Sequence, residues 1–147
     1  MKKVKVLFLC TGNSARSQMA EAFLRHYGNE QYEAYSAGVE PHGINPFTEM
    51  VMDEIGISME GQYSKDLIEY LGKEHFSYLI TVCSNAEERC PSTFPGVSNR
   101  LSWLFEDPAA VDGPDELKLD KFRQVRDQVE AKIKEWLADQ QQGESGR

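Results

Sequence analysis

Residues 4–28 combine a strand-like run, a short loop and a helical pattern, and this combination constrains the fold most. Val4 to Cys10 is a β-branched and aliphatic run, which predicts a buried strand that stops at the turn Thr11-Gly12-Asn13. From Ser17 to Tyr27 the apolar residues recur at helical spacing, and Gly28 follows as a C-terminal stop. A buried strand, a tight loop and a helix in this order indicate an α/β protein with parallel strands.

The rest of the chain continues this alternation. Further strands are predicted from Gln31 to Ser36, from Tyr78 to Cys83 and from Gly96 to Trp103. Helices are predicted from Asn45-Pro46 through Ile55, from a Ser64 cap to near Gly72, and along an apolar stripe formed by Phe122, Val125, Val129, Ile133, Trp136 and Leu137. The pattern predicts an open four-stranded parallel sheet with helices on both faces. Sites in such sheets lie at the carboxyl ends of strands, where we expect Cys10, Ser36, Cys83 and Asp107.

Length, charge and cysteine content limit the classes of protein. With 147 residues, 40% of them hydrophobic, we expect one catalytic domain of residues 1–139 and a flexible polar tail of residues 140–147, and nothing demands more than a monomer. The net charge of -8 argues against nucleic acid or an anionic membrane as a partner. Three cysteines do not suit a secreted disulfide framework, so we expect a reducing, cytoplasmic location. Lys5 interrupts the only run that resembles a signal peptide.

The loop from Cys10 to Ser17 has the composition of an oxyanion site. A short loop between a strand and a helix can aim backbone N–H groups at an anion, and the helix N-terminus adds partial positive charge. Gly12 permits close approach, Asn13 tolerates a left-handed conformation, and Arg16 offers a planar fork for two oxygens. The predicted oxyanion-binding residues are Thr11, Gly12, Asn13, Ser14, Ala15, Arg16 and Ser17.

Cys10 is the candidate nucleophile of this loop. Loop amides, Arg16 and the helix end all favour the thiolate, so we expect an activated thiol. The competing interpretation is a buried cysteine at a strand end with an incidental arginine nearby.

This loop resembles that of the low-molecular-weight protein tyrosine phosphatases and of the thioredoxin-coupled arsenate reductases of the same family. The resemblance extends from Val4 to about Trp136 and includes Tyr35-Ser36-Ala37-Gly38 and Asp107-Pro108. It implies that Asp107 is a general acid, whereas an Asp-Pro pair is otherwise an ordinary turn.

Cys83 and Cys90 resemble the redox segment of the reductases. Reduction of arsenate takes two electrons, which two thiols supply by forming a disulfide. The resemblance implies that Cys10 attacks arsenic, that Cys83 attacks Cys10 and releases arsenite, and that Cys90 passes the disulfide to thioredoxin. The short segment Ala86 to Arg89 between them is a candidate helix. The alternative is that Cys83 and Cys90 are structural thiols.

Three functional hypotheses follow. The resemblance favours an arsenate reductase that serves arsenic detoxification, without a tightly bound cofactor. A phosphatase is the second, although Ala109 and Ala110 stand where eukaryotic phosphatases place an aromatic residue. A non-enzymatic thiol protein that binds arsenite or senses oxidation is the third.

The sequence gives less support for a metal site than for the oxyanion loop. His26, His42 and His75 lack the spacing of a zinc site. Some reductases of the family bind potassium beside the loop, at positions that match Asn13, Glu21, Ser36 and Asp66. Lys65 precedes Asp66, and its ammonium could replace the cation or repel it.

Overall fold

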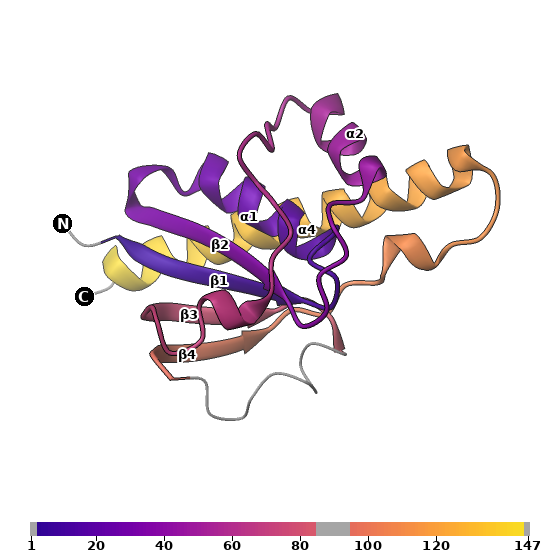
Figure 1. Cartoon of the computed structure of the whole chain (residues 1–147). Coiled ribbons are helices and arrows are strands. Elements are labelled where there is room, and N and C mark those ends of the chain that lie inside the picture. Colours follow the sequence, from indigo (N-terminus) through magenta and orange to yellow (C-terminus); the bar gives the residue numbers. More distant parts are fainter. Residues whose placement is uncertain (1–2, 85–94, 146–147) are drawn as a thin grey trace.

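The computed structural model describes residues 3–84 and 95–145 and contains a sheet of four parallel strands. The strands are β1 (Val4–Cys10), β2 (Tyr32–Gly38), β3 (Phe76–Thr81) and β4 (Val97–Ser102). Their order is β2-β1-β3-β4, so β1 lies inside the sheet between β2 and β3 (Figure 1). The predicted open four-stranded parallel sheet is confirmed.

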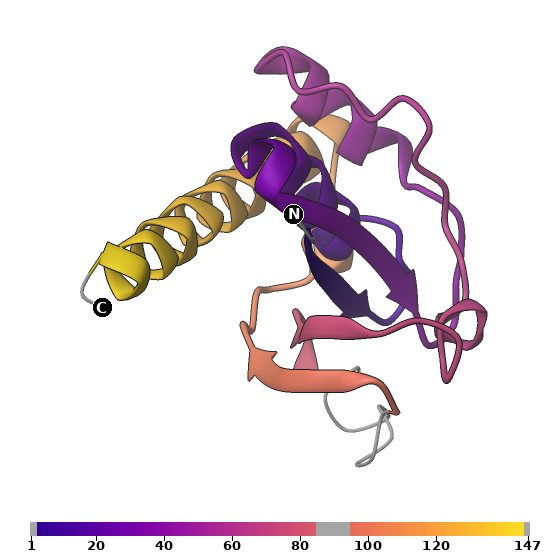
Figure 2. The same cartoon turned by 90° about the vertical axis from the view of Figure 1, so that its left-hand side faces the viewer.

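The described helices are unequal in length and position. They are α1 (Arg16–Tyr27), α2 (Pro46–Glu54) and α4 (Asp115–Ser145), with short 3-10 turns η1 (Asn29–Gln31), η2 (Leu67–Glu69) and η3 (Pro108–Ala110). Helices α1 and α4 lie together on one side of the sheet, and the connection that carries η2 runs along the other side (Figure 2). On that second side the Tyr70 ring packs edge-on against Tyr35 and Phe76. The sheet is therefore covered on both faces.

Of the two helices predicted between β2 and β3, one forms and one does not. Asn45 caps α2 as expected, because its side-chain oxygen accepts a hydrogen bond from the Phe47 amide at 2.9 Å. The helix predicted from Ser64 to Gly72 is wrong. The Ser64 hydroxyl donates instead to the Gly12 carbonyl, and Asp66 caps only the short turn η2.

Helix α4 is longer than its apolar stripe. Its backbone stays helical to Ser145, beyond Gln140, where we predicted that the chain would fray. The division into a catalytic domain of residues 1–139 and a tail stays a prediction. No helix of the described residues is long and apolar enough to cross a membrane.

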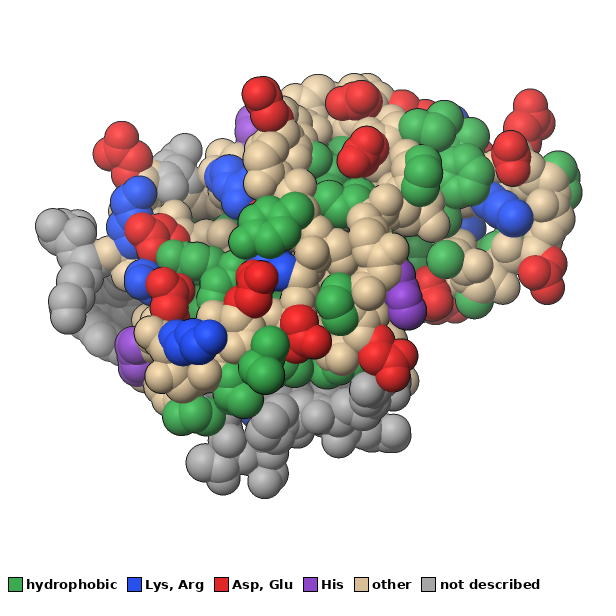
Figure 3. Space-filling view, in the orientation of Figure 1, with side chains coloured by type: hydrophobic (Ala, Val, Ile, Leu, Met, Phe, Trp, Pro, Cys, Tyr) green, Lys and Arg blue, Asp and Glu red, His purple; other side chains and the backbone are tan. Residues whose placement is uncertain are grey.

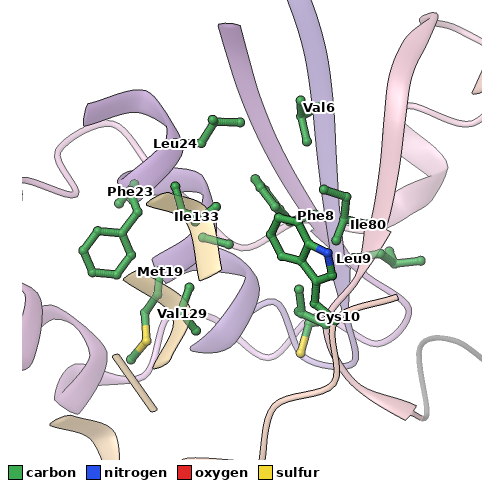
Figure 4. Packing of buried hydrophobic residues seen from close by; sticks show 14 of the residues in the cluster. Val6, Phe8, Leu9, Cys10, Met19, Phe23, Leu24, Ile80, Val129 and Ile133 are labelled. Carbon is green, nitrogen blue, oxygen red and sulfur yellow. The ribbon is translucent and has the colours of Figure 1, made fainter. Parts of the chain in front are cut away.

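The core lies between the sheet and the pair α1 and α4. Figure 4 shows Val6, Phe8 and Ile80 of the sheet beside Met19, Phe23, Leu24, Val129 and Ile133 of the two helices. All of these side chains are buried, and burial of apolar area is the main stabilising contribution to such a fold. This packing fixes the end of β1, and with it Cys10, relative to the start of α1.

Candidate active site

The predicted oxyanion loop lies between the last residue of β1 and the first residue of α1. Cys10 ends the strand and is 2% exposed, and Arg16 begins the helix. Asn13 and Ser17 are fully buried. The loop therefore sits at the carboxyl edge of the sheet, with the helix N-terminus directed at it, as such anion sites require.

Asn13 has the conformation that the sequence predicts. Its φ is 50°, and no other non-glycine residue of the described chain has a positive φ. Its side chain holds this conformation: Oδ1 accepts from the Lys65 amide at 2.9 Å, and Nδ2 donates to Ser17 Oγ and Ser36 Oγ. Asn13 thus fixes the curvature of the loop.

The loop carbonyl groups are bonded to the surrounding protein. Three backbone amides of the next segment donate to the loop: the Glu40 amide to Thr11 O, the His42 amide to Gly12 O and the Asn45 amide to Ser14 O. Three side chains donate as well: Ser64 Oγ to Gly12 O, Gln18 Nε2 to Asn13 O and Thr48 Oγ1 to Ser14 O. This bonding of the carbonyl groups to the surrounding protein is the arrangement expected of a loop whose amides bind an anion.

Two glycines permit the close packing of this region. A Cβ on Gly12 would lie 2.7 Å from His42 Cδ2, and a Cβ on Gly38 would lie 2.7 Å from Thr11 O. The absence of side chains therefore lets the His42 ring and the end of β2 approach the loop.

Arg16 connects the loop to the segment before η3. Its Nη1 donates to Phe105 O at 3.1 Å, and its Nη2 lies 4.0 Å from Asp107 Oδ1. Its Nε is buried and has no hydrogen-bond partner among the described residues. A buried guanidinium N–H without an acceptor is costly, and an oxyanion in the loop would satisfy it.

Asp107 lies at the open side of the site. Its Oδ1 accepts from the Ala109 amide at 2.9 Å and so caps η3, and its side chain is 49% exposed. The structure therefore brings the predicted acid into the neighbourhood of Arg16.

Cys83 follows β3 and is also buried, at 3% exposure. Its Sγ lies 3.2 Å from Thr11 Oγ1, and its thiol is near enough to Cys10 to affect the pKa of that residue. Both cysteines are free. The contact of Thr11 with Cys83 has no sequence signal, because only the sheet topology brings the two positions together. Cys90 and the segment Ala86 to Arg89 lie outside the described residues.

The expected thiolate at Cys10 is wrong for this arrangement. The hydrogen bond with Cys83 and burial raise the pKa of Cys10 well above its ordinary value, although Arg16 and the Thr11 amide lower it. The sequence shows the two lowering influences and predicts that Cys83 lies near Cys10, but it does not show that Cys83 and burial together outweigh those influences.

The residues proposed for potassium do not fit a cation site. Ser36 Oγ donates to Glu21 Oε1 at 2.6 Å, so Asn13, Ser36 and Glu21 do lie together. Asp66 Oδ1, however, accepts from the Ile68 amide. Lys65 Nζ lies 3.9 Å from Glu21 Oε1, with both side chains 5% exposed, and already supplies a cation there. The potassium hypothesis is therefore not supported, and no cluster of three His, Cys, Asp or Glu residues occurs in the described ranges.

Acidic side chains are spread over the face shown in Figure 3, and no continuous basic patch is visible on that face among the described residues. This agrees with the net charge of -8.

Comparison with known proteins places this site in a family context. An arsenate reductase of Shouchella clausii is 43% identical over 136 residues, which cover 92% of this chain and 96% of the relative. A solved arsenate reductase in oxidized state has a TM-score of 0.77 and 29% identity, with 92% and 97% of the two chains covered. A thioredoxin-dependent arsenate reductase of Corynebacterium glutamicum has a TM-score of 0.72 and 26% identity, and the match covers 96% of this chain and 63% of the other.

The match to a family model extends over the same elements that build the site. The model for low molecular weight phosphotyrosine protein phosphatase matches residues 5–145, from β1 to the end of α4. Since it includes the loop between β1 and α1, the segment of Asp107 and the whole sheet, the chain belongs to the low molecular weight phosphotyrosine protein phosphatase family.

Proposed function

We propose that this protein reduces arsenate to arsenite, with Cys10 as nucleophile and Cys83 as the second thiol. The observation that carries this proposal is that two buried thiols, Cys10 and Cys83, lie near one another beside the oxyanion loop. Transfer of a phosphoryl group to Cys10 and then to water needs one thiol, whereas a two-electron reduction needs a second one within reach.

Arsenate would bind in the loop from Thr11 to Ser17. The loop amides and the α1 N-terminus stabilise the anion, and the unpaired Nε of Arg16 gains an acceptor. The planar guanidinium orients the anion, with Asp107 at the open side of the loop.

The first chemical step joins Cys10 Sγ to arsenic and breaks one As–O bond. The leaving hydroxyl takes a proton from Asp107 and departs as water, and the proton released by the Cys10 thiol returns to Asp107 through solvent at the open side of the site. Arsenic is still pentavalent in the resulting thiol ester. Asp107 regains its acidic form for the next cycle.

The second step is the reduction. Cys83 attacks Cys10 Sγ, a disulfide forms between the two sulfurs, and the Cys10–arsenic bond breaks with its electron pair remaining on arsenic. Trivalent arsenite leaves. Cys90 would then attack Cys83, free Cys10 and present the Cys83–Cys90 disulfide to thioredoxin.

Different comparisons support different parts of this proposal. The Shouchella clausii and oxidized-state relatives are arsenate reductases, which supports the substrate. The Corynebacterium glutamicum structure is thioredoxin-dependent, which supports thioredoxin as the electron donor. The roles of Cys10, Arg16, Cys83, Cys90 and Asp107 are our assignments, as is a monomeric, cytoplasmic enzyme.

A phosphatase is the second candidate function. The same loop, Arg16 and Asp107 would bind a phosphate ester and protonate its leaving oxygen, and the family model is that of phosphatases. Weak phosphatase activity is therefore compatible with the reductase proposal. The third hypothesis, a thiol protein without catalysis, would leave the oxyanion loop without a purpose.

A coupled assay tests the proposal. Purified protein with thioredoxin, thioredoxin reductase and NADPH should oxidise NADPH only when arsenate is added. The Cys10→Ser variant should lose this activity and any phosphatase activity while its melting temperature stays near that of the wild type. If the wild type hydrolyses phosphate esters but oxidises no NADPH with arsenate, the protein is a phosphatase and the reductase proposal fails.

A further inference from the structure

Lys65 is a buried ammonium group that the proposed chemistry does not use. Its side chain is 5% exposed and lies 3.9 Å from Glu21 Oε1. Nζ also donates to Tyr63 O at 2.7 Å and lies 4.4 Å from the centre of the Tyr63 ring. A buried lysine is rare unless it is paired, so this environment calls for an explanation.

A directed chain of hydrogen bonds runs from Lys65 to the oxyanion loop. Glu21 Oε1 faces the ammonium and accepts from Ser36 Oγ at 2.6 Å, and Ser36 Oγ accepts from Asn13 Nδ2 at 3.0 Å. The Lys65 backbone amide also donates directly to Asn13 Oδ1 at 2.9 Å, which is a second connection between Lys65 and Asn13. Each donor and acceptor has one defined direction, which requires Glu21 to be an acceptor.

Glu21 is buried away from water, so neighbouring charged groups have to balance its carboxylate. Glu21 is 4% exposed, and its Oε2 accepts from Arg25, which is itself half exposed. Burial lowers the pKa of Lys65, and the carboxylates of Glu21 and Glu69 offset part of this lowering. Lys65 is the buried cation that faces the Glu21 carboxylate, and a buried carboxylate without such a partner is unfavourable.

We infer that Lys65 is a positioning residue for the oxyanion loop, whose ammonium acts through Glu21 and Ser36 to hold Asn13 in its left-handed conformation. This inference rests on the proposed function, because it concerns the same loop.

A small cavity beside Lys65 makes the inference testable with ions. It measures about 190 Å³ and is lined by residues that include Glu21, Arg25, Tyr35, Tyr63, Lys65 and Tyr70. Removal of the lysine side chain would join its volume to this cavity. A potassium or ammonium ion could then reach Glu21 from solution.

The experiment measures binding of inorganic phosphate by calorimetry, in choline chloride and in KCl at equal ionic strength. Wild type should bind equally in both salts. Lys65→Met, which keeps the bulk and loses the charge, should bind about tenfold more weakly. Lys65→Ala should bind weakly in choline chloride and regain several-fold affinity in potassium or ammonium chloride. Lys134→Met, at an exposed position of α4, is the matched control and should bind like the wild type.

Ser36→Ala tests the connection without touching the ion pair. It cuts the chain between Glu21 and Asn13, so it should weaken phosphate binding as Lys65→Met does even if Lys65→Met folds poorly. In the coupled assay both variants should raise KM for arsenate more than they lower kcat, because the loop and not the thiols is disturbed.

The outcomes separate this inference from the proposed function. Unchanged phosphate affinity in Lys65→Met and Ser36→Ala would overturn the inference alone. A failure of cations to restore Lys65→Ala would overturn the role of the lysine charge. A wild type that binds neither phosphate nor arsenate would overturn the oxyanion loop itself, and with it the proposed function.

Discussion

The buried thiol of Cys83 lies close enough to the buried thiol of Cys10, behind the oxyanion loop, to be the largest influence that raises the pKa of Cys10. The sheet causes this proximity, because β1 and β3 are parallel neighbours whose paired residues include Leu9 and Thr81. Cys10 follows Leu9 directly, and Cys83 lies two residues after Thr81, so both cysteines come at the same edge of the sheet. The second thiol near the nucleophile thus comes from the strand order.

The first prediction concerns the reactivity of Cys10 with pH. Its pKa is raised, so the neutral thiol predominates at pH 7 and the thiolate fraction grows as pH rises. The rate of alkylation by iodoacetamide should therefore increase with pH through a midpoint above that of a free cysteine. Cys83→Ala removes the largest raising influence while Arg16 remains, so it should lower the midpoint and speed alkylation at pH 7. Peptide mapping by mass spectrometry follows Cys10 separately. A wild-type midpoint below that of free cysteine would show that Cys10 is a thiolate after all.

The second prediction concerns Arg16→Lys, which keeps the charge and removes the planar fork. Loss of a charged hydrogen bond costs about 1.5–3 kcal/mol, so phosphate should bind roughly 10- to 100-fold more weakly. Arg16 also donates to Phe105 O, so the variant's melting temperature must be compared with that of the wild type. Wild-type affinity in a folded Arg16→Lys protein would count against the orientation assigned to arsenate.

The third prediction concerns Asp107→Asn. The amide can still accept from the Ala109 amide and cap η3, but it cannot give a proton to the leaving oxygen. The maximal rate of arsenate reduction should fall by about 10²- to 10⁴-fold, the usual contribution of a general acid. Phosphate affinity should change little, since Asp107 lies 4.0 Å from Arg16 and at the open side of the loop. If kcat and its pH profile were unchanged, another group would have to be the acid.

Several features of the site follow from local sequence. The left-handed Asn13, the Asn45 cap and the placement of Cys10 at a strand end depend on the residues next to them, and each was predictable from those residues. The parallel sheet likewise follows from alternating strand and helix patterns.

The features that sequence analysis missed depend on distant contacts. Ser64 is a good N-cap residue, but the Gly12 carbonyl takes its hydroxyl, so no helix begins there. The buried Lys65 follows from Glu21 and Tyr63 lying around it, and the raised pKa of Cys10 follows from Cys83. Neither feature can be predicted from neighbouring residues in the sequence, because each depends on contacts that form only when the sheet and the connection that carries η2 are packed together.

The last prediction concerns Cys90→Ser, which should separate a reductase from a phosphatase. Because the Cys10 and Cys83 thiols lie near one another and can together supply two electrons, the variant should reduce about one equivalent of arsenate and then stop. The trapped product should be a Cys10–Cys83 disulfide, buried enough that thioredoxin regenerates it poorly, whereas wild type should accumulate a Cys83–Cys90 disulfide. Peptide mapping after a single turnover distinguishes the two bonds. Repeated turnover by Cys90→Ser with thioredoxin, or a first disulfide without Cys10, would contradict the proposed order of attack.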